Sequence, residues 1–286
     1  MKVSAILVNY NTGDVIGTAI DSVCRQTGVS FEILVVDNAS PDQSAARLRA
    51  LPYPQLTLIE NTQNIGFGAA NNLAARDAQG EYLLMINPDA RFTSNHDLAR
   101  LVEWMDQHPG CGLCGATILH NGQQTGPKLD YPGHKKIQRS WDLPPGPAWV
   151  AGAFMLARKT AFEDIGGFDE AFFLYSEEID LGLRLRLAGN TVGFVEDVEI
   201  AHIGGVSETH SDPYDCWRRR TASRYLFIRK HYPAAVCLQQ FKKEKRRASL
   251  RIRWYALTRK TSPKKTLYQA VFDAASGAIT SLDQAI

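Results

Sequence analysis

The chain has 286 residues, of which 44% are hydrophobic, 22% charged and 9% aromatic, a composition that excludes disordered, collagen-like and coiled-coil chains. Its 32 basic and 30 acidic residues leave a formal net charge of +2, which by itself favours neither a nucleic-acid nor a membrane partner. The longest apolar stretch covers residues 149–157, well short of the roughly 20 residues that span a bilayer.

The N-terminal residues and the cysteines indicate a cytoplasmic protein. The first residues include one lysine and a short apolar run, without a signal-peptide cleavage pattern. The five cysteines are odd in number and scattered, unlike a disulfide framework. Cys111 and Cys114 have the spacing of a redox or zinc pair, but they lack a second ligand pair and lie in a strand-like run. We therefore expect them to be buried structural thiols.

The first 110 residues alternate strand-like and helical patterns. Short apolar runs lie at residues 3–8, 33–36, 56–59 and 82–86, and the stretches between them have helical spacing. This repetition predicts parallel strands joined by right-handed crossovers, with helices on both faces of the sheet.

Polar clusters follow three of these predicted strands, at residues 9–12 (NYNT), 37–40 (DNAS) and 87–90 (NPDA). Such residues also make ordinary turns. Ligands of parallel sheets, however, bind at the carboxyl ends of the strands, and three such loops together favour a binding site.

Residues 64–71 nearly match the glycine-rich dinucleotide fingerprint, but they follow the third predicted strand instead of the first. A Rossmann oxidoreductase is therefore disfavoured, and the absence of a GxxxxGKS/T sequence leaves a P-loop nucleotidase unsupported. These glycines suit two interpretations equally: close approach of a backbone to a diphosphate, or a tight helix start.

Asp89 follows Pro88 at the end of the fourth predicted strand. A carboxylate in this position can hold Mg²⁺ or Mn²⁺, since these ions take one or two carboxylates and complete their shell with phosphate and water. The alternative is a helix N-cap, although Asn95 and Asp97 can also cap the following helix. His202, more often a structural residue when alone, is of interest in combination with Asp89.

The region after residue 110 is less regular. Residues 122–147 predict a long loop, and residues 150–156 a buried strand. A helix with an acidic first turn is predicted between a Ser176 cap and a stop at Gly189. Its three acids either offset the helix dipole or include a catalytic carboxylate, because nearby aromatic residues can raise a carboxyl pKa by desolvation. From about residue 215 the pattern is helical.

Taken in order, these motifs resemble glycosyltransferase family 2 with its GT-A fold, and specifically its bacterial rhamnosyltransferase-like branch. The resemblance covers about residues 2–235, through residues 8–12, 35–40, 64–68, 87–89, 166–170, 177–181 and 202. It implies an α/β fold with a mostly parallel central sheet flanked by helices. It also implies an inverting transferase that uses a nucleotide-diphosphate sugar and, usually, a divalent metal, Mg²⁺ or Mn²⁺.

The resemblance assigns roles to the matching residues. Glu178 is the first choice as general base, but it replaces the family's Asp, so Glu177 or Asp180 remain alternatives. Asp89 and His202 are the implied metal ligands, and Asn87 replaces the first Asp of the family's metal motif. The implied nucleotide-binding residues are Asn9, Tyr10, Asp37, Asn64, Gly66 and Asn87, and the implied acceptor-binding residues are Asp169 and Glu177.

The C-terminal region is strongly basic. Residues 242–265 contain eleven basic residues and one acid, a charge of +10, and the last 21 residues carry −2, which leaves −6 on residues 1–241. Leu250, Trp254 and Leu257 share one face of a predicted helix. Such a helix either lies on an anionic membrane surface or packs its apolar stripe on the catalytic domain, and no nucleic-acid-binding motif accompanies it.

These patterns predict a catalytic domain over residues 1–235 and a basic helical extension over residues 236–286. The catalytic domain would contain a nucleotide-binding half (1–110) and an acceptor-binding half (111–235). The apolar face of the last helix would pack on the body or on a second subunit, which would make a homodimer.

The predicted activity is sugar transfer to a saccharide or lipid-linked saccharide, in bacterial cell-surface polysaccharide synthesis at the inner face of the cytoplasmic membrane. The first choice of donor is dTDP-L-rhamnose, followed by UDP- and GDP-sugars. One alternative is a nucleotidyltransferase, although the first loop lacks basic residues that clamp phosphates. The other is a non-catalytic sugar-nucleotide-binding scaffold, which Asn87 and Glu178 suggest.

Overall fold

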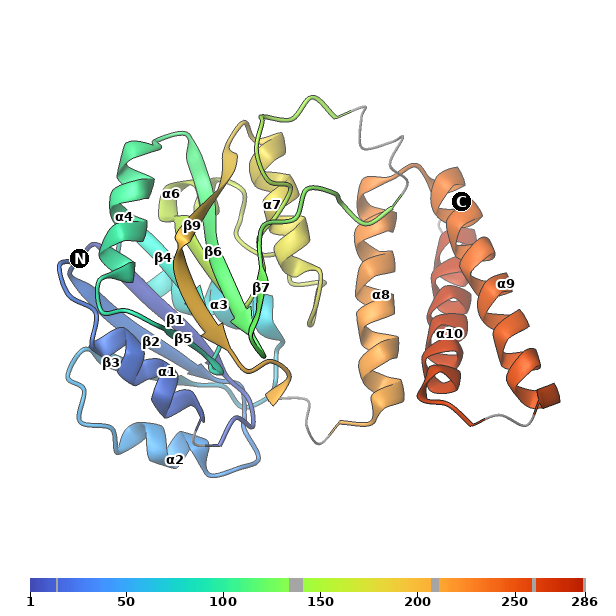
Figure 1. The fold of residues 1–286 in the computed structure, drawn as a ribbon, viewed down its shortest axis with the longest axis horizontal. Coiled ribbons are helices and arrows are strands. Elements are labelled where there is room, and N and C mark those ends of the chain that lie inside the picture. The colour runs from blue at the N-terminus through green and yellow to red at the C-terminus, as the bar shows by residue number, and fades with distance from the viewer. Residues whose placement is uncertain (14, 134–140, 207–210, 259–260, 285–286) are drawn as a thin grey trace. The chain divides into compact units, whose positions relative to one another are not determined.

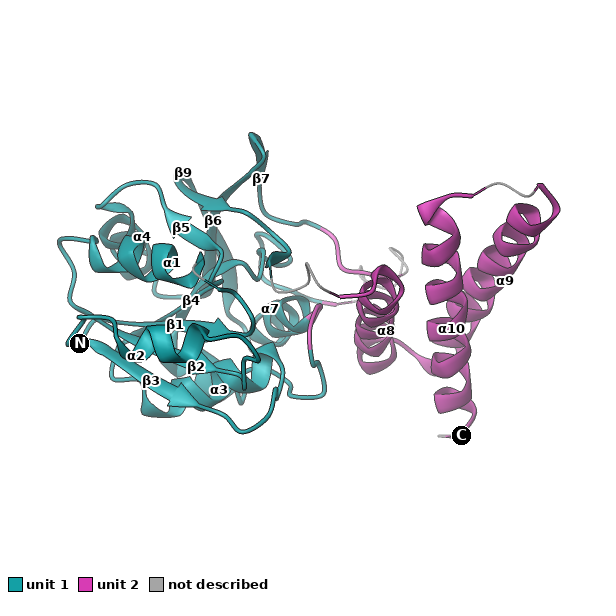
Figure 2. Ribbon diagram, turned by 90° about the horizontal axis from the view of Figure 1, so that it is seen from below, with its two compact units in different colours: residues 1–129, 142–173, 177–207 teal, residues 130–141, 174–176, 208–286 magenta. Residues whose placement is uncertain are grey.

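The computed structural model describes all residues except 14, 134–140, 207–210, 259–260 and 285–286 (Figure 1). Contacts within the chain divide it into two units (Figure 2). Unit 1 comprises Met1–Leu129, Asp142–Phe173 and Glu177–Ser207, and unit 2 comprises Asp130–Trp141, Leu174–Ser176 and Glu208–Ile286.

The predicted strands of the first half are present and parallel. They are β1 (Val3–Asn9), β2 (Phe31–Asp37), β3 (Leu56–Glu60) and β4 (Tyr82–Ile86), in the spatial order β3-β2-β1-β4. The intervening helices are α1 (Val15–Cys24), α2 (Ser44–Arg49) and α3 (Phe67–Asp77). The carboxyl ends of these strands therefore lie along one edge, as predicted.

The second half of the sheet is mixed. Beyond β4 the order continues through β8 (Phe154–Arg158), β6 (Cys111–His120), β9 (Thr191–His202) and β5 (Ala90–Phe92), with β7 (Gln123–Thr125) paired to β6. The mostly parallel arrangement thus holds for the first half, whereas β8, β7 and β5 run antiparallel to their neighbours. β5 follows β4 after residues 87–89 but pairs with β9 at the far end of the order, so the sheet curls back and β5 contacts α1.

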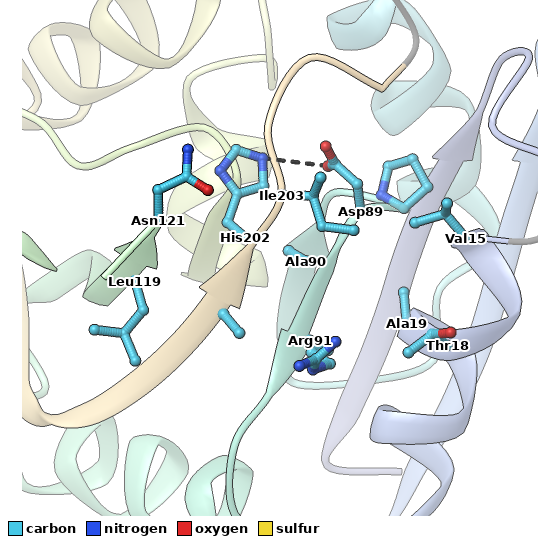
Figure 3. A pocket seen from close by; sticks show the side chains of 12 residues that line it. Val15, Thr18, Ala19, Asp89, Ala90, Arg91, Leu119, Asn121, His202 and Ile203 are labelled. Carbon is cyan, nitrogen blue, oxygen red and sulfur yellow. Dashed lines mark ion pairs between the residues drawn. The ribbon is translucent and has the colours of Figure 1, made fainter. Parts of the chain in front are cut away.

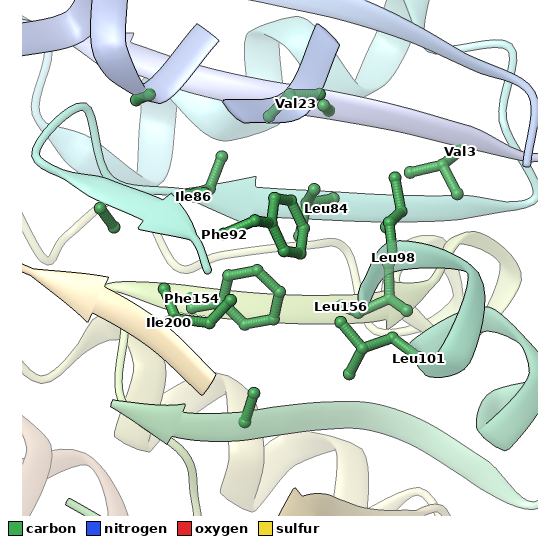
Figure 4. Packing of buried hydrophobic residues seen from close by; sticks show 14 of the residues in the cluster. Val3, Val23, Leu84, Ile86, Phe92, Leu98, Leu101, Phe154, Leu156 and Ile200 are labelled. Atoms are coloured by element: carbon green, nitrogen blue, oxygen red, sulfur yellow. The ribbon is translucent and has the colours of Figure 1, made fainter. Parts of the chain in front are cut away.

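Helices cover both faces of the sheet. Val3, Ala5 and Leu7 of β1 join the core beneath α1 and α4 (Asp97–Gln107), whereas Ile6 and Val8 join the core shared with α3, α6 (Lys159–Asp164) and α7 (Glu177–Leu187). In Figure 4, Val3 and Leu84 point toward Leu98 of α4. Because both faces are covered, β1 is buried and almost wholly apolar along its length.

Several local predictions are confirmed. Helix α7 ends before Gly189, whose φ of +88° is the left-handed conformation of a helix stop. Cys111 and Cys114 are buried and form no disulfide. The predicted strand at 150–156 begins only at Phe154, because the residues before it form a turn in which the Phe154 amide donates to the Ala151 carbonyl (3.2 Å). The predicted loop at 122–147 contains β7, and its residues 134–140 lie outside the described residues.

Unit 2 is built mainly from α8 (Pro213–His231), α9 (Ala234–Thr258) and α10 (Pro263–Asp283). Asp212 and Ser262 cap α8 and α10, each followed by a proline at the first helical position. The Tyr225 hydroxyl of α8 donates to Glu244 of α9 (2.6 Å), and Tyr214 of α8 donates to Asp273 of α10 (2.7 Å). The contacts thus group α8 with α9 and α10, whereas the predicted boundary at residue 235 separates them.

Within the described residues, no helix is long and apolar enough to cross a membrane.

Candidate active site

The first cluster at the carboxyl edge joins the ends of β1 and β2. Asn9 is fully buried, and its Nδ2 lies within hydrogen-bond distance of Asp37 Oδ1 (2.6 Å), Ser44 Oγ (2.7 Å) and Ser40 Oγ (3.1 Å). Its Oδ1 accepts a short hydrogen bond from Thr12. The Asn9 side chain therefore holds the loops after both strands together.

Asp37 belongs to the same network. Its Oδ2 accepts a hydrogen bond from the Ser40 amide (3.1 Å), and only 4% of the residue is exposed. Tyr10, beside this network, is partly exposed. The structure thus brings Asn9 and Asp37 together, with both Asp37 oxygens already in internal hydrogen bonds. Base binding by Asp37 and nucleotide contacts by Tyr10 stay predictions.

The glycine-rich segment packs against a distant loop. Gly66 has a φ of +90°, and a Cβ there would lie 2.5 Å from the Phe173 carbonyl oxygen, which accepts a hydrogen bond from the Phe67 amide (2.9 Å). The Asn64 side chain accepts from the Gly66 amide (3.0 Å), and Asn38 Nδ2 donates to the Gly66 carbonyl (3.1 Å). Glycine is therefore required at position 66 for two reasons: the start of α3 needs a positive φ, and the Phe173 carbonyl leaves no room for a Cβ.

Asp89 stands in the turn between β4 and β5, and not at a helix start. Its backbone oxygen accepts from the Ile203 amide (3.1 Å) and its Oδ2 from the Gly204 amide (2.9 Å), so the turn is fixed to the end of β9. The residue is 8% exposed. Burial raises the pKa of the Asp89 carboxyl, but the adjacent His202 and the Gly204 amide outweigh burial and bring that pKa below its usual value. Asp89 is therefore ionised at neutral pH.

His202, the last residue of β9, faces Asp89. Its Nε2 lies 3.2 Å from Asp89 Oδ1 (Figure 3). This nitrogen is buried. Although it lies at ion-pair distance from Asp89, it has no hydrogen-bond partner of good geometry among the described residues. A divalent cation can bind between an imidazole nitrogen and a carboxylate oxygen that lie side by side in this way. No group of three or more His, Cys, Asp or Glu residues occurs in the described part of the chain, so the remaining ligands would come from substrate and water.

His120 positions the loop that carries His202. Its Nδ1 lies 3.0 Å from the His202 carbonyl oxygen, and its Nε2 lies 3.1 Å from Asn121 Nδ2. A neutral His120 that accepts from Asn121 donates to that carbonyl. Neither His120 nor Asn121 was predicted from the sequence. The signal for this turn is Asn121-Gly122, a typical hairpin turn sequence in which both residues have positive φ between β6 and β7.

A cavity of about 320 Å³ opens beside the Asp89–His202 pair (Figure 3). Val15 and Ala19 of α1 and Leu119 of β6 supply apolar walls, while Arg91 and Asn121 add polar groups. This volume falls in the range of small-ligand sites. The pair therefore borders a space that a substrate group can enter.

The three acids of α7 have different environments. Asp180 is fully buried and accepts from Arg184 Nε (2.6 Å), whose guanidinium also donates to the Ile165 and Gly167 carbonyls. Glu177 is 4% exposed, and its Oε2 has no hydrogen-bond partner among the described residues. Burial first, and the nearby Glu178 second, raise the pKa of Glu177 well above its usual value. Glu178 alone of the three is only partly buried.

Glu178 lies close to the loop that supports the Asp89 turn. A Cβ at Gly152 would lie 3.5 Å from the Glu178 Cβ, and the next residue, Ala153, accepts the hydrogen bond from Asn87. Residues 152–153 thus connect the start of α7 with residues 87–89. Ser176 before the helix has a φ of +68°, which differs from the extended backbone of the predicted N-cap.

Asp169 lies in the turn between α6 and α7. Its carboxylate accepts from the Ala171 amide (2.9 Å), and its carbonyl accepts from the Phe172 amide (3.1 Å). Asn72 of α3 fixes this turn by donating to the Phe168 carbonyl (2.9 Å) and accepting from the Phe168 amide (2.9 Å). Acceptor contacts by Asp169 and Glu177 stay predictions.

The family model described as "Glycosyl transferase family 2" matches residues 4–166. The chain belongs to this family. It is 31% identical over 220 residues to the rhamnosyltransferase WbbL of Escherichia coli K12, covering 69% of this chain and 81% of that protein. It is 26% identical over 256 residues to the N-acetylglucosaminyl-diphospho-decaprenol L-rhamnosyltransferase of Mycobacterium tuberculosis, covering 78% and 82%.

Other likenesses concern part of a longer protein or the fold alone. The match to the O-antigen biosynthesis protein RfbC of Myxococcus xanthus is 31% identical and covers 70% of this chain but 17% of that protein. The mannosyltransferase PcManGT of Pyrobaculum calidifontis, solved with GDP-Man and Mn²⁺, has a TM-score of 0.57 at 20% identity and covers 100% of this chain and 76% of its own. The predicted GT-A fold is thereby confirmed. The chain is a glycosyltransferase, and the nucleotidyltransferase hypothesis is wrong.

Proposed function

We propose that this glycosyltransferase transfers L-rhamnose from dTDP-L-rhamnose to a saccharide or lipid-linked saccharide during bacterial cell-surface polysaccharide synthesis, at the cytoplasmic face of the membrane. The two rhamnosyltransferases that align with most of the chain support the sugar, and the mycobacterial relative's name includes a diphospho-decaprenol acceptor. The observation that carries the proposal is the adjacent pair of Asp89 Oδ1 and His202 Nε2 beside an open cavity.

Asp89 and His202 fit a divalent cation, Mg²⁺ or Mn²⁺. The ionised carboxylate would supply one ligand and the buried Nε2 another, while the Gly204 amide and His120 hold the two groups in place. When bound, such an ion would neutralise the negative charge that develops on the diphosphate leaving group.

Glu178 is the proposed base for the acceptor hydroxyl. Asp180 is already paired with Arg184, and Glu177 is buried, with a pKa that burial raises well above its usual value and that favours its protonated form, so neither is suited to accept a proton. Glu178 is ionisable and partly exposed, and it can take the proton as the hydroxyl oxygen attacks the anomeric carbon. Attack on the face opposite the leaving diphosphate inverts the anomeric configuration.

The base assignment is tested with Glu178→Gln, which keeps size and hydrogen bonding but removes the proton acceptor. Transfer should fall by about 10³-fold, within the range for loss of a general base, while nucleotide affinity stays within about twofold. Glu163→Gln, an exposed change on α6, is the matched control and should be fully active. Full transfer by Glu178→Gln would contradict the assignment.

The donor is tested by thermal shift with dTDP, UDP and GDP, because a nucleotide that binds only the folded state raises the unfolding midpoint. We expect dTDP to give the largest rise, followed by turnover of dTDP-L-rhamnose with Mg²⁺ or Mn²⁺. A larger rise of the midpoint with GDP or UDP would contradict the assignment of dTDP-L-rhamnose and would indicate a GDP- or UDP-sugar as the donor. Tight nucleotide binding without turnover of any donor would favour the non-catalytic scaffold.

A further inference from the structure

Helix α9 exposes three large apolar side chains on one face. Leu250 is 56% exposed, Trp254 is 41% exposed and Leu257 is 84% exposed. Their spacings of four and three residues place them within about 60° of one another around the helix axis. Exposed aliphatic side chains grouped in this way cost solvation free energy in water, which favours a partner for this face.

Cations surround these apolar side chains. Lys243, Arg246, Arg247 and Arg253 are exposed, and by helical geometry all four lie within about 60° of Leu250. We call these four cations, with Leu250, Trp254 and Leu257, the basic-apolar face. Lys245 lies outside this set, because its Nζ stands over the Phe272 ring of α10 (5.1 Å).

The opposite side of α9 is already used for packing within unit 2. Its buried residues are Cys237, Phe241, Ala248 and Tyr255. Glu244, the single acid of residues 242–265, also faces inward, where it accepts from the Tyr225 hydroxyl (2.6 Å) and pairs with Arg224. The basic-apolar face therefore contains no carboxylate to offset its positive charge.

We propose that the basic-apolar face docks the chain on an anionic lipid bilayer. Lys and Arg side chains suit anionic head groups. Two leucines with an exposed tryptophan between them suit insertion at the boundary between head groups and acyl chains. The three apolar residues extend over about 10 Å of helix, so a shallow, parallel orientation brings all of them to the same depth.

Other occupants fit this face less well. A second copy of the chain would bring four cations against four, which costs electrostatic free energy. A nucleic acid would neutralise the cations but would leave the exposed leucines without an apolar environment. An anionic bilayer satisfies both parts of the face. Docking of this kind requires neither the donor nor transfer, so it stands or fails separately from the proposed reaction.

The test is co-sedimentation of the full chain with vesicles of phosphatidylcholine containing about 30 mol% phosphatidylglycerol, in about 50 mM salt. The wild-type chain should bind these vesicles and not vesicles of phosphatidylcholine alone. Arg247→Glu/Arg253→Glu should lower the partition coefficient at least tenfold. The matched control, Arg25→Glu/Arg76→Glu, changes two exposed arginines of unit 1 by the same total charge and should bind as the wild type does.

The apolar part is tested with Leu250→Ser/Leu257→Ser and with brominated phosphatidylcholine mixed into the anionic vesicles. The serine variant should bind at least fivefold more weakly, at an unchanged unfolding midpoint. Bromine should quench tryptophan fluorescence in the wild type and much less in Trp254→Phe. Equal vesicle binding by the arginine variant and its control would overturn the proposal. Stronger binding to an oligonucleotide than to vesicles, unaffected by the serine changes, would also overturn it. So would a dimer that is present in the wild type and lost in the variants. A lower unfolding midpoint of the serine variant would overturn it as well, because it would show that this face packs on the protein itself.

Discussion

Two polar clusters at the same edge of the sheet, Asn9–Asp37 and Asp89–His202, look alike in sequence but differ in their hydrogen bonding. The Asn9 amide and both Asp37 oxygens are engaged by neighbouring loop residues. In the second cluster Asp89 Oδ2 is held by the Gly204 amide, whereas Oδ1 faces a buried His202 nitrogen that lacks a hydrogen-bond partner among the described residues. The first cluster is satisfied by the protein, and we propose that a ligand completes the second.

This difference separates residues that hold the site from residues that act in it. A buried amide with every hydrogen bond made contributes to stability, and its loss leaves its partners unsatisfied. A buried nitrogen that faces a carboxylate, as His202 Nε2 faces Asp89 Oδ1, can share a ligand with it, and such a pair is retained where binding compensates its cost in stability. Substitutions in the Asn9–Asp37 cluster should therefore lower mainly stability, whereas substitutions in the Asp89–His202 cluster should lower mainly activity.

Asp89→Asn should have the largest effect of the changes made in these two clusters. The change keeps the side-chain shape and an oxygen for the Gly204 amide but removes the charge that suits a cation. Transfer should fall by about 10³-fold, equivalent to about 4 kcal/mol of transition-state stabilisation, with little change in the unfolding midpoint. Initial rates at saturating Mn²⁺ measure this, with the exposed Asp77→Asn as control. Retained activity would place Asp89 among the purely structural residues.

Asn9→Ala should have the converse effect. Loss of the amide leaves Thr12, Asp37 and Ser44 without a shared partner, and the free energy of unfolding should fall by about 2–4 kcal/mol. Urea denaturation measures the change, and the exposed Asn95→Ala is the control. A stable Asn9→Ala protein that has lost nucleotide binding would show that Asn9 acts directly on the ligand.

Glu177→Gln should give the smallest effect, and one that depends on pH. Because burial raises the pKa of Glu177, its stabilising contribution is complete below the unfolded value near 4.3 and is lost as the pH rises toward the folded value. The glutamine variant should thus be more stable than the wild type at pH 8 and equal to it at pH 4. Thermal unfolding at both pH values measures this difference, and equal midpoints at pH 8 would show that the buried carboxyl is not destabilised there.

Periodicity predicted much of the fold. The apolar runs of β1 to β4 and the stop at Gly189 depend on local sequence, and the structure has them at the predicted positions. The strand predicted from residue 150 begins at Phe154, because residues 151–153 form a turn closed by the hydrogen bond from the Phe154 amide to the Ala151 carbonyl. The grouping of α8 with α9 and α10 depends on tertiary contacts such as Tyr214 with Asp273, which no local pattern reveals.

The candidate site was predictable in its residue types but not in its division of roles. The resemblance to the family named Asp89, His202 and Glu178, yet the saturation of Asp37 by Asn9 and Ser40 requires the loops after β1 and β2 to meet. Asp180 remained an alternative to Glu178, the first choice, until its partner Arg184 was known. The reason for Gly66, a clash with the Phe173 carbonyl, comes from a residue more than a hundred positions away.

The most direct measurement is Mn²⁺ affinity in the presence of a nucleoside diphosphate, followed by loss of the free-ion electron paramagnetic resonance signal. We predict that the wild-type chain binds one Mn²⁺, that His202→Ala weakens this binding at least tenfold, and that Asn9→Ala and the exposed control His108→Ala leave it within about twofold, measured where each variant is folded. Unchanged Mn²⁺ affinity in His202→Ala would contradict the assignment of the Asp89–His202 pair as the metal site.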